Sequence, residues 1–318
     1  MFNYAVRRIL ISIPVLFAVT VVVFLLIEIA PGDIADFFIN PEINYDEESL
    51  QAIRERFGLD DPLPVRYAIW IGNVLQGDLG YSFLSGEPVA RVVTRRFLNT
   101  FELMSAALII GLVLGVLLGI FTAVRQYSFW DYLFTGLSFL GIAMPAFVTG
   151  ILVLWLFAII WPIFPAGGTR TIGIERSFLD HLQYLVLPVF VLSLAQIATF
   201  MRYTRFSMLD VLGQDYVRTA RGKGLGPAIV QVRHALPNAL MPVITVVGLS
   251  LPVLVVGAVF TETIFSWPGM GTLYLSAVNA RDVPLIMGLN LFIAVMVLAA
   301  NLLTDLAYGM VDPRIRYD

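Results

Sequence analysis

The sequence predicts an all-α membrane protein with six transmembrane helices, a long extracytoplasmic segment after the first and a cytoplasmic helix between the fourth and the fifth. Of its 318 residues, 58 % are hydrophobic and 14 % are charged, and the mean hydropathy is +0.84, so polar side chains are too few to cover a soluble domain. The apolar residues form six blocks of roughly 20 or more positions, the length that a helix needs to cross a ~30 Å hydrocarbon core. Lys and Arg are also distributed unevenly among the connecting segments.

The first apolar block follows Arg7 and Arg8, as the core of a secretory signal would. It is too long for a signal, and no small-residue cleavage site follows it, so we expect it to be retained as a membrane span. The predicted spans are 9–30, 100–123, 133–161, 184–202, 239–261 and 285–308.

An even number of spans places both termini on one side of the membrane. The segments assigned to the inside carry more Lys and Arg than Asp and Glu, whereas the outside segments carry more acids. Basic residues are retained on the cytoplasmic face, so both termini are predicted to be cytoplasmic. The chain then divides into 1–30 (N-terminus and first span), 31–99 (extracytoplasmic helical segment), 100–308 (five-helix core with the 203–238 cytoplasmic loop) and 309–318 (cytoplasmic tail).

Two short helices are predicted in the outer segment. The stretch 46–58 has acids in the first turn of the expected helix, arginines in its last turn, and Gly58 as the residue that follows the helix. This order matches the helix dipole and the preference for glycine after a helix. A second helix is expected near Val65 to Leu75.

Three features mark the predicted spans themselves. Gly111, Gly115 and Gly119 align on one face of the second span, where another helix can approach closely. Pro145 in the third span and Pro188 in the fourth each remove a backbone hydrogen bond and should kink their helices.

The last span carries a polar stripe. Asn290, Asn301 and Asp305 fall on one side of a 3.6-residue helix, and such groups avoid lipid. A solute path and a structural hydrogen-bond network explain this stripe equally well. The candidate residues for a path are Asn290, Asn301 and Pro145, whose kink would serve either gating or shape.

The most informative segment is the loop 203–238, which is rich in charge. Asp215 is in a position to cap a short helix that ends near Gly222 and Gly224. Such a helix, lying parallel to the membrane and exposing small residues, would fit into a groove on a partner. The alternative is a basic amphipathic segment that lies on anionic lipid, but lipid attraction requires no particular spacing of Ala, Gly and Pro.

This loop resembles the EAA loop of bacterial ABC import permeases, in which Glu-Ala-Ala, three residues, Gly, nine residues and Ile-x-Leu-Pro recur. Arg218-Thr219-Ala220 stands at the Glu-Ala-Ala positions, Gly224 at the Gly, His234 at the Ile and Leu236-Pro237 at the Leu-Pro. The departures at Glu and Ile resemble the form found in one subfamily.

That subfamily is the dipeptide/oligopeptide/nickel permease group, and the resemblance covers nearly the whole chain. Its long segment after the first span resembles the B-type half of the permease pair. The matching motifs are Arg7-Arg8, Pro31-Gly32-Asp33, the Gly58 to Val65 and Gly77 to Ser82 stretches, Glu262-x-Ile264-Phe265-x-x-Pro268-Gly269-x-Gly271, Arg281-Asp282-x-Pro284 and Asp312 to Arg316.

The resemblance implies a permease subunit that performs no chemistry itself. It implies a second homologous permease, two cytosolic ATPase subunits or domains that hold ATP and Mg, and an extracytoplasmic binding protein that delivers the solute. The implied location is the bacterial or archaeal plasma (inner) membrane. The residues that would form the ATPase-coupling helix and its flank are Asp215, Tyr216, Arg218, Thr219, Ala220, Arg221, Lys223, Gly224, Leu225 and Pro237.

Several classes of function are disfavoured by the sequence. No G-x-x-x-x-G-K-[ST] loop is present, since Val217 stands where the first Gly would be before Gly222-Lys223, so the energy must come from another subunit. The chain has no Cys, and His181 and His234 lie far apart in sequence, so we expect no bound metal or other cofactor, and nothing indicates nucleic acid.

A passive channel, an ion-coupled carrier and an intramembrane enzyme lack positive support, since no pair of ionisable residues at mid-membrane and no reactive cluster is apparent. The related permeases carry peptides, nickel chelates, glutathione or oligosaccharides. We expect a peptide substrate.

Overall fold

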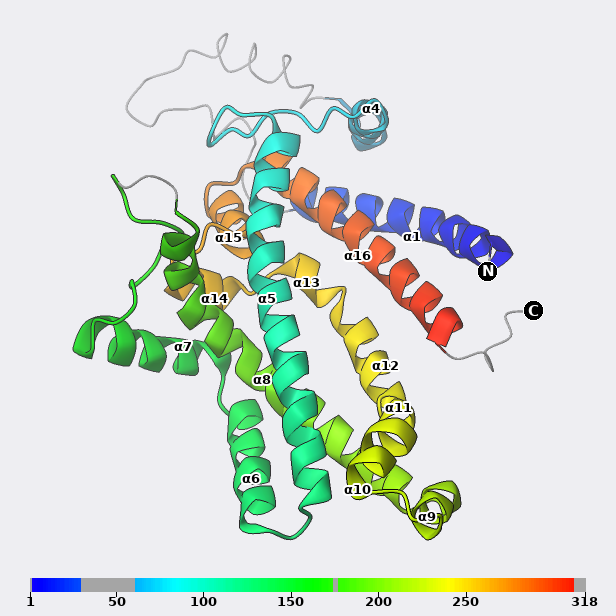
Figure 1. The fold of residues 1–318 in the computed structure, drawn as a ribbon. Helices are drawn as coiled ribbons and strands as arrows, with labels where there is room; N and C mark the ends of the chain where they lie inside the picture. Colours follow the sequence, from blue (N-terminus) through cyan, green and yellow to red (C-terminus); the bar gives the residue numbers. More distant parts are fainter. Residues whose placement is uncertain (1, 30–60, 174–176, 312–318) are drawn as a thin grey trace. The chain divides into compact units, whose positions relative to one another are not determined.

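The computed structural model describes residues 2–29, 61–173 and 177–311, and the regular elements in this part of the chain are helical apart from one isolated bridge between Tyr81 and Pro88 (Figure 1). The elements, in chain order, are α1 (Phe2–Ile29), α4 (Leu63–Leu75), α5 (Val89–Val124), α6 (Phe129–Ala143), α7 (Ala146–Leu154), the π-helix η1 (Trp155–Ile160), α8 (Phe178–Leu212), α9 (Asp215–Gly222), α10 (Pro227–Ile229), the π-helix η2 (Val230–Ala235), α11 (Leu236–Ala239), α12 (Met241–Ser250), α13 (Val253–Val256), α14 (Val259–Ile264), α15 (Met270–Asn279) and α16 (Val283–Val311).

Four described helices, α1, α5, α8 and α16, are long and apolar enough to cross a membrane. The number rises to six if the bent pairs α6–η1 and α10–α13 each count as one span, so the helical membrane fold is confirmed. The helices extend beyond the predicted spans: α5 begins at Val89 and α8 continues to Leu212. Hydropathy detects only the bilayer-length apolar part of a helix, and polar residues such as Arg95 and Arg205 continue it.

The third predicted span bends by 102° between Ala143 and Ala146, as the different directions of α6 and α7 show (Figure 1). Pro145 restricts Met144 to an extended conformation, with φ −81° and ψ 122°, and this ends α6. The predicted distortion at Pro145 is therefore present. The prediction of one kinked helix was wrong, because the span consists of two separate helices. Pro188, by contrast, lies inside α8, which continues through it.

The fifth predicted span, 239–261, is not one helix. It is divided into α12, α13 and α14, with Pro252 before α13 and Gly257 after it at φ +86°. A proline without an N–H and a glycine in the left-handed region interrupt the helix on either side of α13.

The helices group into two compact units. One consists mainly of Leu98–Thr272 with the end of α16, and the other of Phe2–Phe97 with Leu273–Leu298.

In the second unit, α4 packs along α1 and confirms the helix predicted near Val65 to Leu75. The hydroxyls of Tyr67 and Thr20 are 2.8 Å apart, and the Arg66 guanidinium donates to Glu28 at 2.6 Å. The Tyr67 ring also contacts Phe24 edge-on. The helix predicted over 46–58 and the motifs at 31–33 and 312–316 lie outside the described residues.

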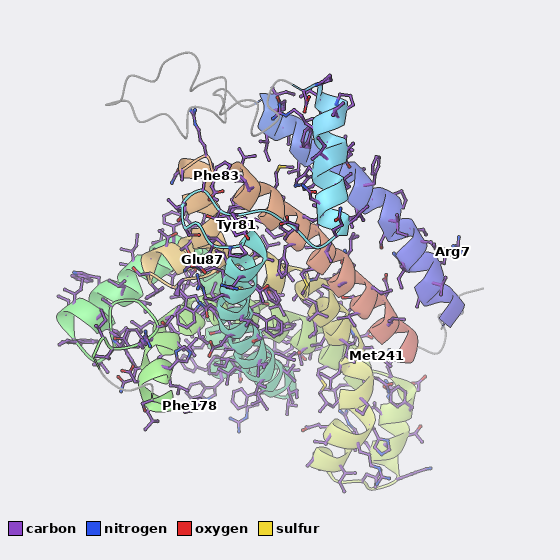
Figure 2. The ribbon with its side chains drawn as sticks, turned by 90° about the horizontal axis from the view of Figure 1, so that it is seen from above. Arg7, Tyr81, Phe83, Glu87, Phe178 and Met241 are labelled. Atoms are coloured by element: carbon purple, nitrogen blue, oxygen red, sulfur yellow. The ribbon has the colours of Figure 1, made fainter. Side chains whose placement is uncertain are left out.

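Asp282 is fully buried and organises the rest of this unit. One carboxylate oxygen accepts from the backbone N–H of Leu285 and so caps the first turn of α16. The other accepts from the Ser82 hydroxyl at 2.6 Å and the Leu84 N–H at 3.0 Å. This carboxylate therefore holds the segment before α5, in which Tyr81, Phe83 and Glu87 lie (Figure 2), against the start of α16.

In the first unit, the glycine face of α5 packs against α8. A side chain at Gly115 would place Cβ 2.6 Å from Cβ of Phe200, and one at Gly119 would place it 2.5 Å from Cβ of Thr204. Gly111 approaches Gln196 in the same way. The two helices therefore meet at four-residue intervals, with backbone close to backbone.

A second buried carboxylate, Glu262, explains the glycine-rich motif that follows it. Its Oε2 accepts the N–H groups of Gly271 and Thr272 at the start of α15, and its Oε1 accepts the Thr100 hydroxyl of α5 at 2.7 Å. A Cβ at Gly269 would overlap the carboxylate. The carboxylate thus neutralises the amino end of α15 and joins it to α5.

Candidate functional site

The loop between α8 and α12 contains the short helix α9 (Figure 1). Two residues, Gly213 and Gln214, separate it from the end of α8. Gln214 stands at its N-cap with no side-chain bond, and Asp215 is the first helical residue, so the prediction that Asp215 caps the helix was wrong. Its carboxylate still lies in the first turn and Arg221 in the last, as the helix dipole prefers.

Gly224 ends this helix. Its φ is +77°, in the left-handed region that glycine adopts without strain. The Gly224 N–H donates to the Arg221 carbonyl and the Leu225 N–H donates to the Ala220 carbonyl, which is the bonding of a Schellman motif. The position therefore requires glycine or a residue that tolerates positive φ.

The inward face of α9 is held by an apolar cluster. Val217 is fully buried and Ala220 is 6 % exposed. The remaining buried members come from the ends of α5 and α8 and from η2 and α11: Ala123, Met208, Val211, Val230, Ala235 and Ala239. The short helix is therefore fixed to the ends of two long helices rather than suspended on a flexible loop.

The outward face of α9 is polar and basic. The exposed residues of α9 are Asp215, Tyr216, Arg218, Thr219, Arg221 and Gly222, and directly after it Lys223, Gly224 and Leu225 are also exposed. Within this group Arg218 forms an ion pair with Asp215 at 3.4 Å, and at such exposure the pair contributes little. Ala220 points inward, so it belongs to the support of the helix and not to its outer surface.

The segment after α9 returns through a π-helix, η2, to α11. Pro237, which is exposed, lies in the first turn of α11, where its missing N–H costs least. The next residue, Asn238, donates from Nδ2 to the Tyr216 hydroxyl at 2.9 Å. This bond joins α11, where the loop returns, to the first turn of α9.

Sequence reasoning missed Val217 and Asn238 as parts of this site. Val217 and Ala220 stand three residues apart, the spacing of one helical face, and this spacing predicts the buried side of α9. No comparable signal exists for Asn238, because its bond to Tyr216 depends on how the chain returns after α10.

The three candidate path residues lie in different settings. Pro145 stands at the N-cap of α7. Asn290 donates to the Ile286 carbonyl of its own helix, and Asn301 is exposed. The bond of Asn290 is one that a structural role alone would produce.

Within 2–29, 61–173 and 177–311, no group of three or more His, Asp or Glu side chains is arranged to hold a metal ion.

Two family models match this chain. Residues 1–104 match the N-terminal part, and residues 115–317 the main part, of the binding-protein-dependent transport system inner membrane component. A putative peptide permease protein of Brucella suis is 45 % identical over 317 residues, which cover 99 % of each chain.

The oligopeptide transport system permease protein AppB of Bacillus subtilis is 41 % identical over 99 % of each chain. The dipeptide transport system permease protein DppB of Escherichia coli is 37 % identical, covering 100 % of this chain and 99 % of that one. A chain of an inward-facing MetNI methionine ABC transporter resembles the fold with a TM-score of 0.53 at 13 % identity, covering 71 % of this chain and 99 % of the other.

Proposed function

The chain belongs to the family of binding-protein-dependent transport system inner membrane components, and from this we propose that it is the peptide-translocating B-type permease subunit of an ATP-driven ABC importer. The full-length relatives whose names specify peptides, oligopeptides and dipeptides support peptides over nickel, glutathione or oligosaccharides. The family and the apolar helices make it a multi-pass inner-membrane protein.

The observation that carries the mechanism is the position of α9. The helix presents a basic outer face while Val217 and Ala220 bury its inner face against the ends of α5 and α8. A displacement imposed on that outer face would be passed to both long helices, because the apolar cluster is closely packed. This arrangement supports a role for α9 in receiving a movement from a partner.

In this mechanism two ATPase subunits or domains hold ATP and Mg, and this chain holds neither and hydrolyses nothing. A second homologous permease completes the path, an extracytoplasmic binding protein delivers the peptide, and lipid surrounds the spans. Both termini and α9 lie on the cytoplasmic side, as the distribution of Lys and Arg indicates. ATP binding shifts the complex between inward-open and outward-open states.

The test is transport by the complete complex in vesicles, with labelled di- and oligopeptides outside and ATP at the ATPases. We expect peptide uptake that needs ATP, the binding protein and this chain together. Nickel, glutathione and oligosaccharides should not be taken up. Uptake that persists without ATP would instead indicate a channel or an ion-coupled carrier.

A further inference from the structure

A buried ion pair outside the α9 loop joins α6 to α8. The Arg205 guanidinium donates through Nε to Oδ1 of Asp131 at 2.7 Å and through Nη2 to Oδ2 at 2.8 Å. The Asp131 side chain is 3 % exposed and the Arg205 side chain 26 %. Two parallel bonds fix the relative orientation of the guanidinium and the carboxylate, which a single bond would not.

The same carboxylate also fixes the turn between α5 and α6. Oδ2 accepts the backbone N–H of Tyr127 at 3.0 Å, and Oδ1 accepts the Thr135 hydroxyl at 3.3 Å. Tyr127 has φ +66°, a conformation that a residue with a Cβ adopts only where its surroundings hold it. Asp131 therefore connects the turn after α5, the start of α6 and the last two turns of α8.

Helix α6 also packs on α8 and α5, since Gly141 lies against Leu194 and Ala198 of α8 and the Phe134 ring contacts Phe121 edge-on. Its buried residues are Asp131 and Ser138, while apolar residues such as Leu137 and Leu140 are exposed. Beyond α6 the chain bends by 102° into α7, so the orientation of α6 also sets the direction in which α7 begins.

Arg205 lies one helical turn before Met208, which belongs to the apolar cluster under α9. Ala123, four residues before Tyr127, belongs to the same cluster. The contacts therefore form a closed ring: α9 packs on α5 and α8, and Asp131 joins α5 and α8 to α6.

We propose that Asp131 and Arg205 are positioning residues for energy coupling, because their two-pronged bond makes α6 move as one body with α9. This inference rests on the proposed function. Neither residue is proposed to touch the peptide or the ATPase. The pair acts through α8 and the α5–α6 turn, so that a displacement of α9 reorients α6 and, through the bend at Pro145, the start of α7.

The first experiment measures peptide imported per ATP hydrolysed in vesicles that contain the complete complex. Asp131→Asn keeps the shape of the side chain but removes the charge, and Arg205→Lys keeps the charge but cannot form the two-pronged bond. We expect a fall in this ratio of roughly two- to thirtyfold for Asp131→Asn, the range for residues along a coupling network, with a smaller fall for Arg205→Lys. A double variant that exchanges the two residues, Asp131→Arg with Arg205→Asp, should recover part of the lost import per ATP.

The matched control is Asp210→Asn, which neutralises an exposed carboxylate on the same helix α8 and should leave the ratio unchanged. Assembly of each variant with its partners is measured by gel filtration, and only assembled complexes are compared.

The second experiment measures the distance between α6 and α9. The chain has no cysteine, so spin labels can be placed at Tyr132→Cys on α6 and at Gln214→Cys at the N-cap of α9, both exposed positions. We expect one narrow distance distribution that is the same without nucleotide and with trapped ATP. Adding Asp131→Asn should broaden it or make it depend on nucleotide.

The inference would be overturned if Asp131→Asn imported as much peptide per ATP as the wild type. It would also be overturned if this yield fell while the distance distribution stayed unchanged. If Gly224→Val uncouples hydrolysis while Asp131→Asn does not, this inference fails and the proposed function stands. If the unmodified complex imports peptide without ATP, the proposed function itself fails.

Discussion

Gly224 shows how one backbone angle constrains the α9 loop. Its φ of +77° is strained for a β-branched residue by about 1–2 kcal/mol, yet a Cβ there would meet none of the described residues beyond its chain neighbours within 4 Å. The restriction therefore comes from the backbone and from whatever covers α9, not from crowding within the chain.

We expect Gly224→Val to insert normally but to weaken ATPase association or to uncouple hydrolysis from uptake. Gly224→Asn is the matched variant, because Asn tolerates positive φ, and it should stay closer to the wild type. Peptide uptake and phosphate release are measured together in vesicles. Tightly coupled transport by the Val variant would refute the role given to this helix end.

The buried Glu262 supports a second prediction at this scale. Glu262→Gln replaces one acceptor oxygen by a donor, so either the Thr100 hydroxyl or the N–H groups of Gly271 and Thr272 lose their partner. We expect a loss of about 1–3 kcal/mol, seen as a lower thermal unfolding midpoint in detergent. Glu87→Gln, at an exposed pair with Arg95, serves as control and should change little. Equal shifts in both variants would contradict the anchoring role.

At the scale of elements, the close approach of α5 and α8 can be tested with a single methyl group. Gly115→Ala would place Cβ 2.6 Å from Cβ of Phe200 and 2.9 Å from the Ile197 carbonyl oxygen. Overpacking of this kind costs about 1–3 kcal/mol, so the unfolding midpoint should fall.

Gly136→Ala in α6 is the control, because in the described part of the chain its new methyl group meets no residue from outside its own helix turn within 4 Å, and alanine favours a helix. A stable Gly115→Ala variant would mean that the two helices can separate without cost.

The elements also show what the sequence can and cannot predict. Apolar length identified α1, α5, α8 and α16, and an acid at Asp215 with glycines at 222 and 224 located α9, because these signals are local. The 102° bend at Pro145 and the division of 239–261 depend on what replaces the lost helical bonds, which is a matter of tertiary contacts.

The residues of the candidate site also divide into those that the sequence indicates and those that only the structure shows. The outer residues of α9 were named from the resemblance of the 203–238 loop to the EAA loop. The inward direction of Ala220, the Asn238–Tyr216 bond and the partners of Asp131 depend on contacts between residues distant in sequence.

At the scale of the whole molecule, the predicted topology can be tested on a chain that has no native cysteine. A probe at Ser85→Cys, before α5, should be labelled from outside intact cells, and one at Thr219→Cys, on α9, only after permeabilisation. The physical reason is the retention of Lys and Arg on the inner face. Labelling of both positions from outside would reverse the assignment of the α9 loop.

The Asp282 carboxylate has a consequence for how the chain is made. Ser82 and Leu84 are translated about two hundred residues before the acceptor that they share, so at typical synthesis rates they wait roughly ten seconds or longer for it. During that interval the early helices are already inserted, but Ser82 and Leu84 lack the buried carboxylate that accepts their hydrogen bonds. A ribosome that stalls before Asp282 would thus release a product recognisably incomplete to membrane proteases, although most of its spans are in place.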